Sequence, residues 1–393
     1  MIDDNQQALL ELLKASLFGM EPLYPEGVDW DAVLKEARDQ TVAALAAPAV
    51  PAQEASKWQI SVARNKMRFL QILDEQTKLA QLFDDAGIPM AIIKGCAAAM
   101  YYPIPLNRSM GDIDFVVPFK RVDEANQLMT ENGYHYSNTT QRHYDYAKNG
   151  IEFELHHHYS DPDWDFENLI SEGLSNVTVS EIYDKQFHTL PVEINGLVLL
   201  DHVRRHIMKG LGMRQIIDWM MFVHAELNTD SAWEERFASL AREIGLETLA
   251  ITMTKTCKSW LGLPDEISWC DSADAEAAQQ LLELVFHFGN FGRKNQIEHQ
   301  AAESFTAGVR KQGLFRYLQN TGEKNWEIYH KHKELRPFAW LYQSFRFMGK
   351  GTAALFRGER FSQDLSVGKE RAGLYHKLGI DKAIGAARKN DDR

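Results

Sequence analysis

The sequence is poor in cysteine, in long apolar runs and in positive charge. Its three cysteines, Cys96, Cys257 and Cys270, are an odd number spread far apart, so no disulfide framework is expected and a reducing cytoplasm is the simpler location. No window approaches a run of about 18 apolar residues, so we expect no transmembrane segment. The first residues, from Met1 to Asn5, have no basic group ahead of an apolar stretch, which argues against a signal peptide.

Basic residues are outnumbered in the chain as a whole but not near its end. The 393 residues include 43 Lys and Arg against 55 Asp and Glu, which argues against a protein that coats duplex DNA non-specifically. Residues 331–393 contain 14 basic and 7 acidic residues, so an acidic body is followed by a basic C-terminal region. This asymmetry of charge leaves a polyanion as one alternative partner of the C-terminal region.

Length and composition indicate a globular protein of two or three domains, because 45% of the residues are hydrophobic and 25% are charged. Apolar residues recur with helical spacing both before and after a central stretch. The predicted N-terminal helices cover residues 6–20, 29–47 and 54–86. The predicted C-terminal helices cover residues 197–209, 214–225, 233–244, 246–261, 275–289 and parts of 305–348.

The central stretch has the pattern of short strands. Strands are predicted at 90–93, 112–117, 134–137, 143–147 and 151–158, with helices at 96–102 and 119–131. Asn149-Gly150 is a hairpin signal between the last two strands. The chain is therefore predicted as an α+β protein, mostly helical, with a small mixed β-sheet. We divide it into an N-terminal helical region (1–86), a core that contains the sheet (87–167), a helical domain (168–330) and a basic C-terminal helix and tail (331–393).

The densest chemical signal is the pair Asp112 and Asp114, in a predicted strand. Residues two apart in a strand point to the same face, so the two carboxylates project together while Ile113 and Phe115 face the core. Adjacent carboxylates repel each other unless a cation lies between them, and Mg²⁺ prefers such oxygens together with phosphate oxygens. The pair predicts a two-metal site for phosphoryl or nucleotidyl transfer.

A third carboxylate is expected from the strand at 151–158. Glu152, Glu154 and His156 share one face of that strand, and the residues alone do not decide which glutamate reaches the metals. A carboxylate in that position is also suited to accept the proton of an attacking hydroxyl group. The run from His156 to His158 is not predicted to bind zinc, because consecutive strand residues point to opposite faces.

Lys94 and Gly95 lie where the first strand enters a helix. The free N–H groups and the dipole of a helix N-terminus favour an anion, Gly95 allows a phosphate to approach the backbone, and Lys94 supplies a positive charge. Arg108, four residues before Asp112, is predicted to contact a further phosphate oxygen.

These motifs together resemble the nucleotide-binding core of the DNA polymerase beta superfamily of nucleotidyltransferases. More narrowly, the chain resembles an uncharacterised bacterial nucleotidyltransferase family that has Lys-Gly after the first strand. The matching residues are, in chain order, Ile93-Lys94-Gly95, Tyr102-Pro103, Arg108, Asp112-Ile113-Asp114 and Glu154-Leu155-His156. The resemblance covers roughly residues 5–300 and departs from the superfamily at Cys96, where most members have a serine that contacts phosphate.

The resemblance implies an enzyme that transfers a nucleoside monophosphate from an NTP, such as ATP, to a hydroxyl group. It implies two Mg²⁺ ions held by Asp112, Asp114 and Glu154, and it favours Glu154 over Glu152 as the third acid. Lys94, Gly95 and Arg108 would bind the nucleotide. The acceptor, a small molecule, a protein or an RNA, is not identified. Two alternatives remain open: a binding module of the same fold that has lost turnover, and an enzyme that modifies RNA ends with the help of the basic tail.

Other polar clusters have simpler structural explanations. His202 and His206 are expected to pack or to make surface contacts, and Arg214 and Asp218, four apart on a helix, to form a salt bridge. The acidic residues at 161, 163, 165 and 167 are predicted to lie in a solvated loop. The aromatic segment 337–348 is expected to be a helix packed on the body, with a membrane surface or a nucleic acid as the alternatives.

Overall fold

The structure is a computed structural model, and it forms two compact units, residues 1–291 with 377–393 and residues 292–376. It describes residues 2–140, 142–160, 165–207, 210–290, 294, 314–326, 332–346 and 373–380. The boundaries predicted at residues 86 and 167 fall inside the first unit. Within the described ranges, no helix has both the length and the apolar character needed to cross a membrane.

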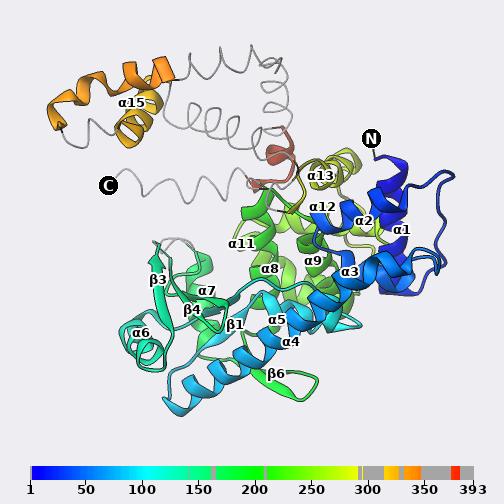
Figure 1. Cartoon of the computed structure of the whole chain (residues 1–393), viewed down its shortest axis with the longest axis horizontal. Helices are drawn as coiled ribbons and strands as arrows, with labels where there is room; N and C mark the ends of the chain where they lie inside the picture. Colours follow the sequence, from blue (N-terminus) through cyan, green and yellow to red (C-terminus); the bar gives the residue numbers. More distant parts are fainter. Residues whose placement is uncertain are drawn as a thin grey trace. The chain divides into compact units, whose positions relative to one another are not determined.

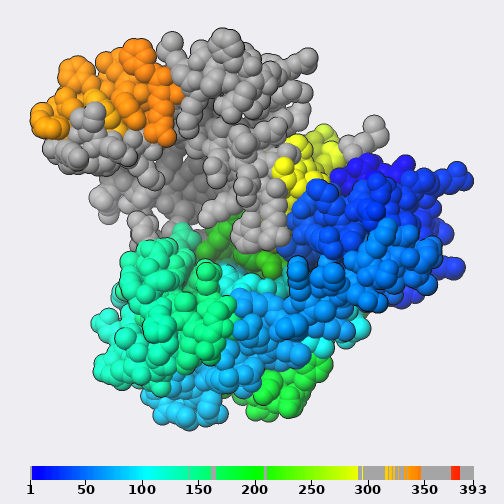
Figure 2. All heavy atoms as spheres, in the orientation of Figure 1, coloured from blue at the N-terminus to red at the C-terminus, as the bar shows by residue number. Residues whose placement is uncertain are grey.

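Four helices precede the sheet: α1 (Asp4–Phe18), α2 (Trp30–Asp39), α3 (Ala43–Ala46) and α4 (Ala55–Asp85). Asp3 begins α1 with a capping box, since its side chain accepts the N–H of Gln6 while the Gln6 side chain accepts the N–H of Asp3. The single helix predicted at 29–47 is divided, because Thr41 adopts a positive φ of 58° and ends α2. Figure 2 shows α4 as a continuous surface that links these N-terminal helices to the sheet region.

Seven strands form one mixed sheet in the order β3-β4-β5-β2-β1-β7-β6 (Figure 1). The β2–β5 and β1–β7 pairs are parallel, and the other neighbours are antiparallel. This sheet among many helices confirms the predicted α+β class. The strands are β1 (Ala91–Ile93), β2 (Ile113–Val116), β3 (His135–Thr139), β4 (His143–Lys148), β5 (Ile151–His156), β6 (Thr178–Ile182) and β7 (Lys185–Thr189).

The hairpin signal at Asn149-Gly150 is confirmed. Both residues have a positive φ, 52° and 73°, as a two-residue turn of this kind requires. The turn fixes the antiparallel register of β4 and β5 from Lys148 opposite Ile151 to His143 opposite His156. Strand β5 also pairs in parallel with β2, so the hairpin delivers its side chains to the centre of the sheet.

Strands β6 and β7 correct the prediction that the sheet ends before residue 167 and that helices follow. Their residues are largely polar, and only a few of them, such as Ile182 and Phe187, are buried. Such an edge hairpin lacks the apolar run of a central strand, which is why periodicity missed it. It joins the sheet through a long-range parallel pair, Ile92 with Thr189.

Apolar side chains from α4 and α6 (Val122–Glu131) cover one face of the sheet. Phe83 and Phe115 meet edge to face with ring centroids 5.5 Å apart, and both are fully buried. Ile113 and Phe115 point into this core, so Asp114 must face the opposite side of the sheet. The apolar face therefore orients the acidic residue that the site uses.

Of the remaining helices of the first unit, α5 follows β1 directly and the others follow β5. Gly196 lets α8 approach α9 closely, since a Cβ atom there would lie 2.2 Å from Cζ of Phe222. The helices are α5 (Gly95–Ala99), α7 (Asp165–Leu174), α8 (Val192–Ile207), α9 (Met213–Glu226), α10 (Asp230–Ala232), α11 (Ala238–Glu243), α12 (Glu247–Trp260) and α13 (Ala275–Phe288).

In the second unit, the structure describes α15 (Leu314–Asn325) and a 3₁₀ turn (Lys333–Phe338) followed by helix to residue 346. Trp326 stacks on Tyr342, with ring centroids 5.2 Å apart. The aromatic segment thus packs in part within this unit, while Phe338 and Phe345 are exposed. The rest of the segments predicted at 305–348, most of the basic tail and two of the four acidic loop positions, 161 and 163, lie outside the described residues.

Candidate active site

Three acidic side chains meet beside the central strands β2 and β5. One oxygen from each of Asp112, Asp114 and Glu154 can be chosen so that all three lie within 4.8 Å of one another. The parallel register places Asp114 directly opposite Glu154, and Asp112 lies just before β2. The structure brings together the three carboxylates named from the sequence, and their role as metal ligands stays a prediction.

The register also separates the two glutamates of β5. Glu154 is half-buried in the acidic cluster, whereas Glu152 is exposed and does not belong to it. Both side chains lie on the same face of β5, so only their position along the strand distinguishes them. The pairing of β5 with β2 sets that position, and this register cannot be predicted from the residues of β5 alone.

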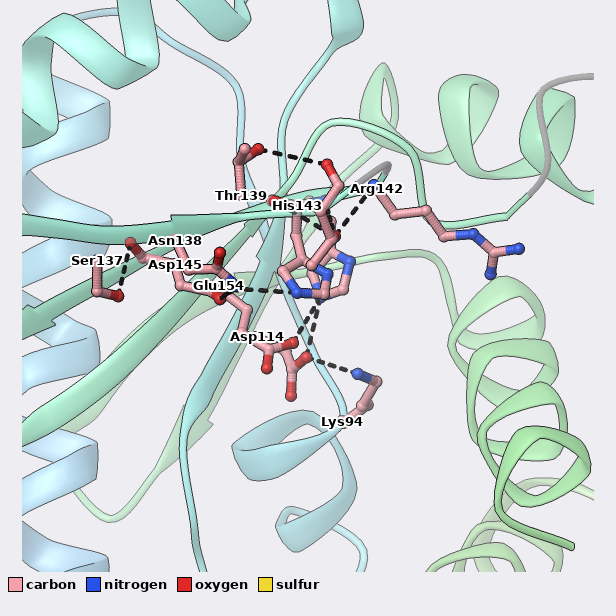
Figure 3. A network of polar contacts seen from close by, with 11 residues as sticks. Lys94, Asp114, Ser137, Asn138, Thr139, Arg142, His143, Asp145 and Glu154 are labelled. Atoms are coloured by element: carbon pink, nitrogen blue, oxygen red, sulfur yellow. Dashed lines mark hydrogen bonds and ion pairs between the residues drawn. The ribbon is translucent and has the colours of Figure 1, made fainter. Parts of the chain in front are cut away.

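Asp114 is the most tightly held acid of the cluster. Its Oδ1 accepts a hydrogen bond from Lys94 Nζ at 2.5 Å (Figure 3) and another from His156 Nε2 at 2.9 Å. Burial by itself would raise the pKa of Asp114, but the Lys94 ammonium and the His156 ring outweigh it and hold that pKa well below its usual range. Asp114 is therefore a carboxylate at neutral pH.

Asp112 is in the opposite electrostatic situation. Burial, followed by the negative charge of Asp114, raises the pKa of Asp112 to about 6. The Lys94 ammonium counteracts this only in part. An acid that is costly to ionise beside other acids is stabilised by an added cation, so the electrostatics of the cluster favour a positively charged ligand.

Lys94 and Gly95 form the junction that was predicted between strand and helix. Strand β1 ends at Ile93 and α5 begins at Gly95. Lys94 has φ 56° and ψ -132°, a conformation that L-residues rarely adopt, and Gly95 has φ 27°. This strained turn aims the Lys94 ammonium at Asp114, with both side chains mostly buried.

Arg108 is placed differently from the predicted phosphate contact. Its Nε and Nη2 donate to the two carboxylate oxygens of Asp218, each at 2.7 Å, and Tyr102 donates to the same carboxylate. Arg108 and Asp218 are only 3% and 2% exposed. The side chain is thus engaged in a buried bidentate ion pair that ties the loop before β2 to α9.

Asp218 is therefore not paired as predicted, because Arg108 and not Arg214 binds it. Arg214 donates instead to the Ser109 carbonyl at 3.2 Å, and its buried Nε has no partner among the described residues. Burial, followed by the positive charge of Arg108, lowers the pKa of Arg214, and the negative charges of Asp218 and Asp112 oppose this. Sequence reasoning missed Arg214 as a basic side chain near the acidic cluster.

Two histidines that sequence reasoning underused lie beside the cluster. His143 on β4 faces His156 on β5, with ring centroids 5.0 Å apart. Counting back from the Asn149-Gly150 turn in a two-residue hairpin pairs these two positions, so the signal was present in the sequence. His202 and His206 pack edge to face on α8, as expected for a packing role.

The acidic cluster fits a hard divalent cation. Carboxylate oxygens are the ligands that Mg²⁺ prefers, and the cluster gathers three of them from two neighbouring strands. Oδ1 of Asp114 already accepts from Lys94 and His156, which leaves Oδ2 together with Asp112 and Glu154 to hold a cation. Lys94 and Arg214 supply positive charge next to it.

Comparisons with known proteins identify one protein family. The model of a protein family described as uncharacterised nucleotidyltransferase matches residues 26–262, which include the whole cluster and α9. No curated protein matches the chain. The chain is similar to the crystal structure of an antigenic nucleotidyltransferase-like protein from Paracoccidioides brasiliensis at 16% identity, with a TM-score of 0.30, and the match covers 50% of this chain and 94% of that one.

Proposed function

Because the chain belongs to the uncharacterised nucleotidyltransferase family, we propose that it is a Mg²⁺-dependent enzyme that transfers a nucleoside monophosphate from an NTP such as ATP to a hydroxyl group. The acceptor is a small molecule, a protein or an RNA. The observation that carries the proposal is the convergence of Asp112, Asp114 and Glu154 within 4.8 Å. The free, buried cysteines suit a cytoplasmic enzyme.

In this proposal the three carboxylates hold the metal ions. Asp114 is ionised at neutral pH, and Asp112 becomes fully ionised when a cation compensates the neighbouring charges. Bound Mg²⁺ would supply charge neutralisation at the triphosphate. Asp114 and Glu154 lie on two paired strands, and Asp112 lies just before β2, so the strand pairing over a packed apolar face holds the carboxylates together.

Basic groups next to the cluster bind the phosphates. Lys94 exchanges Asp114 for a phosphate oxygen when the nucleotide is bound, and the Gly95 backbone lies beside that phosphate. We assign to Arg214 the phosphate contact that the sequence suggested for Arg108, because its Nε has no partner in the described part of the chain, whereas Arg108 is paired with Asp218. Arg108 then has a supporting role for the loop that leads to Asp112.

The proton of the acceptor is taken by Glu154. Its side chain is 29% accessible, so an acceptor can approach it from solvent. The acceptor oxygen forms a bond to the α-phosphorus as the bond to the β-phosphate oxygen breaks, and pyrophosphate leaves. Positioning of the two reactants and stabilisation of charge supply the catalysis.

The test is turnover of labelled NTPs in the presence of Mg²⁺, followed as metal-dependent binding and as pyrophosphate release. An Asp112→Asn, Asp114→Asn double variant should reduce release by about 100-fold or more, because it removes the metal-binding charge. Glu152→Gln is the matched control, since that exposed carboxylate lies on the same strand outside the cluster. A double variant that matches the wild type refutes the assignment.

A second candidate is a nucleotide-binding protein without turnover, which the position of Cys96 favours. The thiol is fully buried, and an S–H group is only a weak hydrogen-bond donor, so Cys96 does not replace the serine hydroxyl as a phosphate contact. Calorimetry separates the two candidates. The binding protein takes up NTP with Mg²⁺ but releases no pyrophosphate with small-molecule, protein or RNA acceptors.

A further inference from the structure

A second group of potential metal ligands shares one residue with the acidic cluster. One ligand atom from each of His143, Glu154 and His156 can be chosen so that all three lie within 4.8 Å of one another. Glu154 is common to both groups, whereas the two histidines come from the facing positions of β4 and β5. The hairpin thus adds nitrogen donors to a site whose other half contains only oxygen donors.

His156 has a nitrogen that no described atom satisfies. The residue is 3% exposed, its Nε2 donates to Oδ1 of Asp114 and lies 3.4 Å from Oε2 of Glu154, and its Nδ1 is buried without a hydrogen-bond partner among the described residues. A histidine that gives its N–H to a carboxylate carries its free lone pair on the other nitrogen, which is the usual arrangement of a metal-bound histidine. An unsatisfied buried nitrogen is costly, so a ligand there stabilises the folded protein.

The other two members of the group have room to adjust. The side chains of His143 and Glu154 are 22% and 29% accessible, and His143 Nε2 lies 3.2 Å from Oδ1 of Asp145. Ligands of a tetrahedral zinc ion at about 2.0–2.1 Å are about 3.4 Å from one another, so separations of up to 4.8 Å must contract by up to about 1.4 Å. Side-chain rotation of two partly exposed residues supplies such a movement.

We propose that His143, Glu154 and His156 form a binding site for a transition metal ion such as Zn²⁺, next to the carboxylate cluster. Two imidazoles and one carboxylate favour Zn²⁺ over Mg²⁺, because Mg²⁺ prefers oxygen ligands only. With three protein ligands, one position of a tetrahedral ion stays open. The site differs from the run His156 to His158, because its second nitrogen donor comes from the neighbouring strand β4.

The test measures metal binding in the absence of nucleotide. The full chain is dialysed against Zn²⁺ with excess Mg²⁺, and bound zinc is counted per chain by mass spectrometry. The wild type should retain one Zn²⁺, and His143→Ala should weaken its binding at least about tenfold, since even partners that only orient a ligand cost this much. Visible absorption of Co²⁺ in the same site should show the intense bands of a four-coordinate ion in the wild type and not in His143→Ala.

Two variants serve as controls. His135→Ala removes an exposed histidine from the same hairpin region, and Asp112→Asn removes an acid that belongs only to the carboxylate cluster, so both should keep Zn²⁺. The proposal is wrong if the wild type binds no Zn²⁺ or if His143→Ala binds it as the wild type does. It is also wrong if Asp112→Asn loses as much affinity as His143→Ala, because the ion then lies among the carboxylates. None of these metal-binding measurements depends on nucleotidyl transfer.

Discussion

A substitution in the buried pair of Arg108 and Asp218 tests whether Arg108 stabilises the fold or binds the substrate. Asp218→Asn keeps the shape of the side chain and the acceptor for Tyr102 but leaves the Arg108 guanidinium without its counter-charge. Both residues are 3% exposed or less, so water cannot hydrate the remaining charge. We therefore expect the variant to lose stability and not merely nucleotide affinity.

The magnitude follows from the contacts. Two charge-assisted hydrogen bonds contribute about 1.5–3 kcal/mol each, and removal of one partner of a buried ion pair costs about 3–5 kcal/mol in measured cases. We expect the free energy of unfolding to fall by about 3–5 kcal/mol, which lowers Tm by roughly 10 °C in a unit of this size. The Arg108→Met, Asp218→Asn double variant has no isolated charge and should recover a large part of that loss.

Urea unfolding followed by tryptophan fluorescence measures the stability, because Trp219 is fully buried on α9 next to Asp218. The same variants are assayed for KM toward NTP. A loss below about 1 kcal/mol together with a raised KM would refute the reasoning. It would return Arg108 to the phosphate-binding role that the sequence suggested.

Three further predictions concern substitutions at single positions. Burial and a neighbouring acid raise the pKa of Asp112 to about 6, so the metal-free folded protein holds a proton that the unfolded chain releases, and stability falls as pH rises from about 4 to about 6. Asp112→Asn should remove this effect and gain about 3 kcal/mol relative to the wild type across that window in urea unfolding at a series of pH values. Lys94→Gly should be about 1–2 kcal/mol more stable than Lys94→Ala, because the combination of φ 56° with ψ -132° is open to glycine but strained for other residues; equal unfolding midpoints would contradict this. Gly196→Ala should lose at least about 2 kcal/mol, since its Cβ would lie 2.2 Å from Phe222, whereas Gly111→Ala, with no atom within 4 Å, should change the unfolding free energy little.

Much of the local structure could be predicted from neighbouring residues. Apolar spacing located α1 and α4, and the positive φ values demanded by Asn149-Gly150 located the β4–β5 hairpin. The alternation of acid and apolar residues in β2 predicted which side chains leave the core. These features depend on interactions within a few residues, so the order of the amino acids is sufficient to specify them.

Long-range pairings could not be predicted in the same way. Strand β7 joins β1 across about a hundred residues, and its polar sequence contains no sign of that partner. Asp218 pairs with Arg108, which is 110 residues away, and not with Arg214 on the adjacent turn of its own helix. Helical spacing favours the local pair, but burial strengthens the distant one, because the bidentate contact is made where water is excluded.

The chemical groups of the site could be read from the order of the residues, because periodicity predicts the face on which Asp112, Asp114 and Glu154 lie. Which of these groups lie close together depends on long-range strand pairing. The parallel register of β2 and β5 brings Glu154, rather than Glu152, to Asp114, and the hairpin brings His143 to His156. The physical reason is that a strand specifies a face with period two, whereas the position along that face is set by a partner strand from elsewhere in the chain.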